Sequence, residues 1–545
     1  MHYLKKRRST SLVFLLIVCF FLSIGTIPHI ADLLEGNNRD AKETNNKLSV
    51  SGSRDYSGIP ISNVDRYSID AELIRDIFGG YVFAWCEERN GDQDVYCQRV
   101  NSNGQFNWSA NGIPLCTVSG DQAVPKLVSD GVGGAVVAWL DNRSGEGYQV
   151  YAQRINSMGE TLWPANGVLL SNLTIYHYIY ELVSDGFGGA IVAWISDMEA
   201  TGRDVYAQRI NKDGMINWTE DGVPVCTASG TQYELDMASD DSGGAVIAWE
   251  DMRYPERGVY IQRVNITGHA LWTSNGTAIC SVMSVRGCHP RIINDGTGTG
   301  SVIVSWCDYR NEAGGDSFAQ KFNSTGHAQW APEGVPICTA LSSREYASPL
   351  VSDGAGGAII AWDESRYTGP SSPYYQQVYA QRITSEGQAN WSIEGVLICS
   401  GFLYATNTQI ASDNSGGAVI TWRDDRNSDF SYNPNIFAQK VNSSGHIQWR
   451  PNGTEVCSNR GWQTNPRMVS DGEDGAVISW SDGRNENYAI YAQRINSEGE
   501  PLWWRSSSGS LGISVLDLAI FVSIVGVISV LSISLTLVVV KKRMQ

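Results

Sequence analysis

Residues 129–163 read SDGVGGAVVAWLDNRSGEGYQVYAQRINSMGETLW, and this pattern returns along almost the whole chain. Asp130-Gly131 and Gly133-Gly134 suit a tight turn, because these residue types tolerate positive φ. Ala135 to Trp139 is a continuous apolar run of strand length, which indicates a strand covered on both faces. Val150 to Ile155 is a further strand, rich in β-branched and aromatic residues. Each unit is therefore predicted to contain about four short antiparallel strands and no helix.

Tryptophan marks the period of the repeat. One series follows the first turn of each unit, at spacings of 54, 55, 55, 57, 56, 60 and 58 residues: Trp85, Trp139, Trp194, Trp249, Trp306, Trp362, Trp422 and Trp480. A second series closes the units: Trp108, Trp163, Trp218, Trp272, Trp330, Trp391, Trp449 and Trp503. Burying an indole removes about 150–250 Å² from water. Tryptophan used this regularly predicts core positions in eight copies of one unit.

The repeats predict an all-β fold, an eight-bladed β-propeller of about 55-residue repeats. Sheets that cannot bury both faces alone must pack on their neighbours, and this period is typical of radial blades. A linear β-solenoid is the alternative, but its usual repeats are shorter and hold fewer hairpins. The phase of the blades stays open, because the segment Gly222 to Cys226 fits either a fifth strand or a crossover.

Both ends of the chain differ from the repeats. Lys5 to Arg8 is basic and Ser11 to Ile24 is apolar, so residues 1–31 are predicted to be a signal peptide or signal anchor. Polar residues 32–64 are predicted to form a flexible linker. The propeller is then expected to span residues 65–505.

After a spacer at 506–517, Leu518 to Val540 is an uncharged apolar run of 23 residues, long enough for a transmembrane helix. The basic residues of the tail, 541–545, indicate that the tail is cytoplasmic and the repeats are extracellular. The expected location is the cell membrane, with a single pass. Ten Asn-x-Ser/Thr sequons agree with an extracellular glycoprotein.

The cysteines fall into two groups. Six occupy one equivalent position per repeat and are predicted to be small buried residues: Cys116, Cys226, Cys280, Cys338, Cys399 and Cys457. A hairpin centred on the turn 295–300 would place Cys288 opposite Cys307, and Cys86 and Cys97 flank the next hairpin of the first repeat. An extracellular location favours disulfides, so these two pairs are predicted to be bridged.

Composition and motifs exclude several functions. The net charge of −17 argues against a nucleic-acid partner, which needs clustered basic residues. The chain has no Gly-x-Ser-x-Gly, His-Glu-x-x-His or phosphate-loop motif, and no catalytic residue or cofactor is predicted. Calcium is the one ion considered, because oxygen ligands recur in the Asp-Gly turns at Asp130, Asp185, Asp295, Asp353 and Asp471. Turn chemistry alone also explains these aspartates.

The motif Trp-x-Asp/Glu-x-Arg recurs in seven of the eight units, as at Asp141 and Arg143. An acid and an arginine two residues apart can form a bidentate bond that ties a turn or a blade to its neighbour. A catalytic pair would not be needed seven times, so the motif is interpreted as structural. The third unit has Ser196 and Met198 instead.

The segment 211–218, NKDGMINW, is loosely similar to the Asp-box of sialidase-type propellers, Ser/Thr-x-Asp-x-Gly-x-x-Trp. Asn211 replaces Ser/Thr, Asp213 directly precedes the glycine, and Trp218 is one residue late. The unit thus resembles exported β-propeller repeats. The resemblance implies the architecture, across residues 65–505, and no active-site residue.

The segments that join successive units vary most, and they are expected to lie together on one face. They carry the candidate binding residues Tyr176, His177, Tyr178, Tyr180, Tyr233, Arg286, His289, Arg344, Tyr346, Tyr404, Arg460 and Trp462. Aromatic and arginine side chains anchor protein interfaces, and aromatic rings also stack on sugars. The predicted function is a binding or adhesion module for an extracellular protein or a surface glycan. A glycosidase-like or lyase-like enzyme and a structural cell-surface coat protein are the two alternatives.

Overall fold

The computed structural model describes residues 57–504 except 64, 90, 199–201, 281–287, 309, 311–314, 339–347, 366–375, 401–404, 427–432, 458 and 486. The predicted leader, most of the predicted linker, the spacer, the membrane-spanning run and the tail lie outside the described residues. Within the described part of the chain, no helix has the length and apolar character needed to cross a bilayer.

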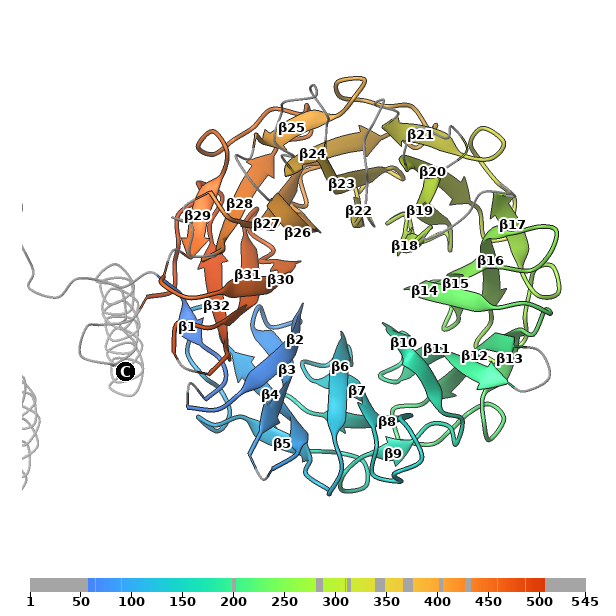
Figure 1. The fold of residues 1–545 in the computed structure, drawn as a ribbon, viewed down its shortest axis with the longest axis horizontal. Coiled ribbons are helices and arrows are strands. Elements are labelled where there is room, and N and C mark those ends of the chain that lie inside the picture. The colour runs from blue at the N-terminus through green and yellow to red at the C-terminus, as the bar shows by residue number, and fades with distance from the viewer. Residues whose placement is uncertain are drawn as a thin grey trace, which may run out of the picture. The chain divides into compact units, whose positions relative to one another are not determined.

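Eight four-stranded antiparallel sheets form a ring of blades around one centre (Figure 1). Blade 1 consists of β2 to β5, and the chain then adds one blade after another until β30, β31 and β32 of blade 8. Inner strands of successive blades contact one another around the whole ring, including β2 with β30. The prediction of an all-β, eight-bladed propeller is confirmed.

Each position in a blade is filled by an equivalent strand. The inner strands are β2 (Ser68–Arg75), β6 (Gln122–Ser129), β10 (Ile175–Ser184), β14 (Gln232–Ser239), β18 (Arg291–Asn294), β22 (Leu350–Ser352), β26 (Ala405–Ser412) and β30 (Gln463–Ser470). The second strands are β3 (Tyr81–Glu88), β7 (Ala135–Asp141), β11 (Ala190–Met198), β15 (Ala245–Asp251), β19 (Val302–Asp308), β23 (Ala358–Ser365), β27 (Ala418–Asp424) and β31 (Ala476–Asp482).

The third strands are β4 (Gln93–Val100), β8 (Gln149–Ile155), β12 (Gly202–Ile210), β16 (Gly258–Val264), β20 (Asp316–Phe322), β24 (Gln376–Ile383), β28 (Asn435–Val441) and β32 (Ala489–Ile495). The outer strands are β5 (Ile113–Cys116), β9 (Val168–Leu169), β13 (Val223–Cys226), β17 (Thr277–Cys280), β21 (Val335–Cys338), β25 (Val396–Cys399), β29 (Thr454–Cys457) and, for blade 8, β1 (Ile59–Pro60). The segment Gly222 to Cys226, whose role was left open by the sequence, therefore holds the fourth strand of its own blade.

The N-terminal strand completes the last blade, which corrects the predicted domain boundary. Ile59 pairs with Ala492 and Pro60 with Tyr491, so β1 lies on β32. The positive φ of Gly58 (+90°) and the Trp480 ring against its α-carbon repeat the arrangement of Gly112 and Trp85 in blade 1. Residues 57–63, assigned above to a flexible linker, thus belong to the propeller.

The core is divided among the seams between blades. Eight apolar clusters each join two neighbouring blades, as in the cluster that holds Val136 of blade 2 and Trp194 of blade 3. The first series of tryptophans is fully buried, as predicted. The six cysteines at the repeated position are also buried between blades.

The second series of tryptophans links each blade to the next. The indole N–H of Trp163 donates to the carbonyl oxygen of Lys212 (3.0 Å), and its ring lies on Gly214 of the following blade. The turn that receives it is the Asp-box-like segment, in which Asn211 Oδ1 accepts from the backbone N–H groups of Asp213 and Met215 (both 3.0 Å). All eight closing tryptophans make the same indole contact.

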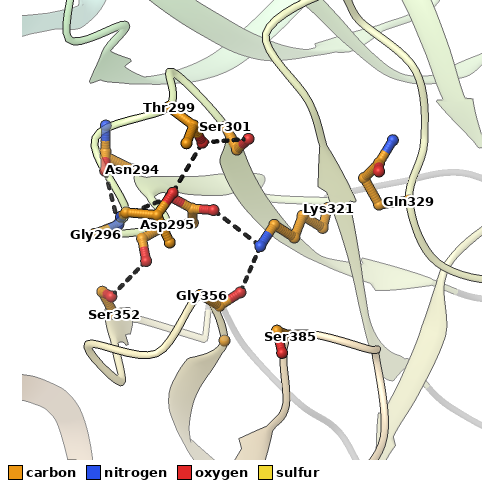
Figure 2. A network of polar contacts seen from close by, with 12 residues as sticks. Asn294, Asp295, Gly296, Thr299, Ser301, Lys321, Gln329, Ser352, Gly356 and Ser385 are labelled. Atoms are coloured by element: carbon orange, nitrogen blue, oxygen red, sulfur yellow. Dashed lines mark hydrogen bonds and ion pairs between the residues drawn. The ribbon is translucent and has the colours of Figure 1, made fainter.

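A buried ion pair fixes the first turn of every blade. The turn aspartate accepts from backbone N–H groups of the turn and pairs with a cation of the third strand: Asp76–Arg99, Asp130–Arg154, Asp185–Arg209, Asp240–Arg263, Asp295–Lys321, Asp353–Arg382, Asp413–Lys440 and Asp471–Arg494. Figure 2 shows Lys321 between Asp295 (2.8 Å) and the carbonyl oxygen of Gly356 in the next blade (2.7 Å). The carboxylates considered for calcium therefore already bind arginine or lysine.

The meander gives the ring two faces. The turns after the first and third strands, such as 130–134 and 156–160, lie at one end of the strands and form the turn face. The hairpins after the second strands, such as 142–148, and the connections between blades lie at the other end and form the connection face.

Neither of the two predicted disulfides is present among the described residues. Cys86 lies opposite Val95 and Cys97 lies opposite Ala84, so the two cysteines are diagonal neighbours and Cys86 and Cys97 are free thiols. Diagonal Cα atoms lie about 7–8 Å apart, beyond the usual span of a disulfide. Cys288 does lie opposite Cys307, because the bulge at His289 shifts the register and the backbone N–H of Cys307 donates to the carbonyl oxygen of Cys288 (2.8 Å). The predicted alignment is therefore present, but Cys288 is a free thiol.

Candidate functional site

The inner strands are bulged near their N-terminal ends. In six blades the residue six positions before the turn aspartate has positive φ: Asp70, Val124, Glu234, His289, Asn407 and Asn465. Blade 3 has two such residues, His177 and Tyr178. All lie between +37° and +62°, a region that non-glycine residues avoid, and β-branched Val124 most of all. Repeated strain of this kind is typical of positions where a bulge redirects side chains.

Four residues before the turn aspartate, each blade contributes one side chain to a central ring: Glu72, Lys126, Glu181, Asp236, Arg291, Pro349, Gln409 and Arg467. Three are acids and three are bases. Arg467 pairs with Glu72 (2.7 Å) across blades 8 and 1, and Lys126 pairs with Glu181 (2.9 Å) across blades 2 and 3. Charged contacts thus join neighbouring blades at the centre.

A cavity of about 720 Å³ lies against this ring. Its polar lining includes Glu181, Asp236, Arg291, Asp363, Gln376, Asn407, Gln409 and Arg467. Asp363 and Gln376 flank the second hairpin of blade 6, so the cavity lies toward the connection face. Carboxylates, amides and guanidinium groups from six blades therefore converge on one hollow.

Two carboxyl groups of the cavity, those of Asp236 and Asp363, have raised pKa values. Burial and the nearby charge of Glu181 raise the pKa of Asp236 to about 6, although its Oδ2 accepts from the backbone N–H of Ile292 (2.9 Å). Burial also raises the pKa of Asp363 to about 6. Each carboxyl group is consequently poised to hold or release a proton near neutral pH.

Arg291 differs from the other cations of the ring. Within the described part of the chain its guanidinium donates to the carbonyl oxygen of its neighbour Pro290 (3.2 Å), and its other N–H groups have no partner there. Lys126 and Arg467 are each held by a carboxylate. Arg291 therefore offers a forked set of donors to the cavity.

Four of the predicted binding residues gather around an arginine that the prediction did not include. Arg203 lies 3.3 Å from the ring centre of Tyr176 and 4.7 Å from that of Tyr233. His177 stacks on Tyr176, with 4.0 Å between the rings. The half-exposed Tyr178 lies against the ring of Tyr148 (4.9 Å). We call these six residues the aromatic cluster of blades 2–4.

The other predicted residues lie elsewhere. Tyr180 is buried, and its hydroxyl donates to the carbonyl oxygens of Val124 and Ala138, so it is a core residue. His289 faces Glu234 (3.7 Å). Trp462 is exposed near Arg423, and Arg460 is exposed beside it, on the far side of the ring from blade 3. Arg286, Arg344, Tyr346 and Tyr404 lie outside the described residues.

The cavity residues were missed by the sequence prediction. The sequence does contain a signal for them. The residue four positions before the turn aspartate is charged in six of the eight units. A charge that recurs at one position of the inner strands indicates a solvated or functional surface.

The Trp-x-Asp/Glu-x-Arg motif is structural, as interpreted above. Asp141 accepts from the indole of Trp139 (2.8 Å) and from Arg143 (2.6 Å), and Arg143 stacks on Tyr151 (3.8 Å). In blade 3, where the acid is replaced by Ser196, the buried indole N–H of Trp194 has no partner among the described residues.

Among the described residues, no group of three or more His, Cys, Asp or Glu side chains is arranged to hold a metal ion. No protein-family model and no curated protein matches the chain.

Several solved propellers have a similar fold. A polysaccharide lyase named as an ulvan lyase has 11% identity and a TM-score of 0.44, over 84% of this chain and 98% of its own. A second polysaccharide lyase has 8% identity and a TM-score of 0.40, over 78% and 89%. An α-L-arabinanase from Penicillium chrysogenum, in complex with arabinobiose, has 11% identity and a TM-score of 0.32, over 82% and 98%. TM-scores below 0.5 do not establish a shared function.

Proposed function

We propose that the protein is a membrane-anchored extracellular β-propeller that binds a glycan in the cavity at the centre of its ring. The observation that carries this proposal is Arg291, which lines a polar cavity of about 720 Å³ and, among the described residues, donates only to the carbonyl oxygen of Pro290. That volume lies within the roughly 300–1,000 Å³ of typical small-ligand sites. Carboxylate and amide groups around Arg291 match the many hydroxyl groups of a sugar.

The guanidinium fork of Arg291 also suits an anionic group, such as the carboxylate or sulfate of an acidic glycan. A protein ligand, the other partner expected from the sequence, fits the open aromatic cluster better than this concave polar cavity. The leader, the apolar run 518–540 and the basic tail support the proposed location at the cell surface.

The proposal is tested on a glycan array that includes neutral and acidic glycans. Full-length protein in lipid nanodiscs is compared with Arg291→Gln and with Arg203→Gln, an arginine of the same face that lies in the aromatic cluster. Saturable binding that Arg291→Gln loses and Arg203→Gln keeps supports the proposal. Binding that only Arg203→Gln loses moves the site to the aromatic cluster.

A second candidate is a glycan-cleaving enzyme of the glycosidase or lyase kind. The specific observation in its favour is that Asp236 and Asp363, both with a pKa of about 6, line the same cavity. Such carboxyl groups suit general acid–base chemistry near neutral pH. Incubation of each captured glycan with the protein, followed by mass spectrometry of the products, separates an enzyme from a binder.

A further inference from the structure

Large apolar side chains gather on the turn face of blades 1–3. The third residue of the first turn is Phe78, Val132 and Phe187 in these blades, and Ile77 precedes Phe78. Met158 and Met215 lie in the turns after the third strands of blades 2 and 3. These six side chains, which we call the apolar sector, are between 58% and 72% exposed.

The other blades show that the fold does not require apolar residues there. At the position of Phe78, blades 4–8 carry Ser242, Thr297, Ala355, Ser415 and Glu473. The two phenylalanines lie across the turns of neighbouring blades instead of entering the core. Phe78 covers Gly133 of blade 2, and Phe187 covers Gly243 of blade 4, where an added Cβ would lie 2.2 Å and 2.7 Å from the rings. The apolar sector is thus a local surface feature of three blades.

The described chain ends beside this sector. Trp503 donates to the carbonyl oxygen of Ser102 (3.0 Å) and lies on Gly104, both in the turn 101–105 on the turn face of blade 1. Thirteen residues, 505–517, then precede the predicted membrane-spanning run at Leu518. Thirteen residues extend over at most about 45 Å. A bilayer that holds residues 518–540 would therefore lie within reach of the turn face of blade 1.

We propose that the apolar sector rests on the lipid bilayer that anchors the chain. This inference rests on the proposed membrane anchoring. Exposed phenylalanine, methionine and branched aliphatic side chains enter the boundary between headgroups and acyl chains. The apolar sector would thus add a second, weaker membrane contact to the one made by the membrane-spanning run. The cavity lies toward the opposite, connection face, so this contact turns the ligand site away from the membrane.

The test uses the full-length protein in phosphatidylcholine vesicles, with Cys19 replaced by serine. All ten described cysteines are buried, so single cysteines introduced at exposed tips can be labelled selectively with a nitroxide. Val132→Cys and Met158→Cys report on the apolar sector. Ser415→Cys, at the position of Val132 in blade 7, is the matched control. Electron paramagnetic resonance then gives the accessibility of each label to oxygen, which concentrates in lipid, and to a water-soluble nickel complex.

We expect an oxygen-to-nickel accessibility ratio at least threefold higher at Val132 and Met158 than at Ser415. Equal, water-like ratios at all three positions in vesicle-bound protein would overturn the membrane contact. Labels that couple to each other in diluted vesicles would assign the sector to a second copy of the chain and overturn it as well. Protein that fails to float with the vesicles would instead refute the membrane anchoring itself.

Discussion

The indole N–H of Trp503 donates to the backbone carbonyl oxygen of Ser102, 3.0 Å away and 401 positions earlier in the chain. It is the same contact that Trp163 makes with the following blade, here made between the last blade and the first. Together with β1 on β32, it closes the ring. The ends of the described chain therefore carry part of the stability of the fold.

Trp503→Ala is expected to lower the free energy of unfolding by about 3–5 kcal/mol, because it removes a buried indole from the ring closure. Urea denaturation followed by circular dichroism measures the change. Trp462→Ala is the control, since that side chain is 44% exposed and is expected to change stability by less than about 1 kcal/mol. Similar losses in both variants would show that the closure contact carries no special weight.

Asp141→Ala is expected to destabilise the protein by about 3–5 kcal/mol, because Arg143 and the indole of Trp139 lose their buried acceptor. Ser196→Ala, at the same position of blade 3, removes one hydrogen bond to the carbonyl oxygen of Thr174 and should cost about 1 kcal/mol. The two denaturation midpoints are compared directly. If both variants lose the same stability, the motif is not the structural tie described above.

Asp363→Asn is expected to change how stability depends on pH. Burial raises the pKa of Asp363 to about 6, whereas an exposed aspartate titrates near about 3.9. Between about pH 4 and pH 6 the folded protein therefore holds a proton that the unfolded chain has released, and the free energy of unfolding falls as the pH rises. The asparagine variant lacks this loss, so its stability relative to wild type should increase by about 2–3 kcal/mol from pH 4 to pH 7.

Urea denaturation at pH 4, 5, 6 and 7 measures this difference. Asp213→Asn, on an exposed turn of the opposite face, is the control for the substitution itself. A constant difference between wild type and Asp363→Asn across this range would contradict the raised pKa.

Tyr180→Phe is expected to lower stability by about 1–3 kcal/mol and to leave ligand binding unchanged. The buried hydroxyl donates to the carbonyl oxygens of Val124 and Ala138, and its loss leaves those acceptors without this donor. Thermal unfolding and glycan binding are measured on the same preparation. Weaker binding with unchanged stability would return Tyr180 to the set of binding residues.

The architecture could be predicted because the same residue types recur at equivalent positions of every unit. The spacing of Trp139 and its equivalents counts the blades, and the glycines at positive φ mark the turns. The closure could not be predicted, because the outer strand of blade 8 is a short copy of the unit, 57–62, with serine in place of the cysteine and without the tryptophans around it.

The candidate site was harder to predict from the sequence, because its residues come together only when the blades pack into a ring. Arg291 and Asp236 are 55 positions apart, and only the packing of blades 4 and 5 brings them to one cavity. Arg203, which gathers the predicted Tyr176 and Tyr233, lies on a third strand instead of a connection between blades. Prediction from the variable connections therefore found the aromatic cluster in part and missed the cavity.

The central claim is tested most directly by the dissociation constant for the glycan that the full-length protein captures best, measured by isothermal titration calorimetry. Arg291→Gln is expected to weaken binding at least tenfold, while Arg203→Gln leaves it within twofold of wild type. Unchanged binding in Arg291→Gln would contradict the assignment of the ligand site to the central cavity.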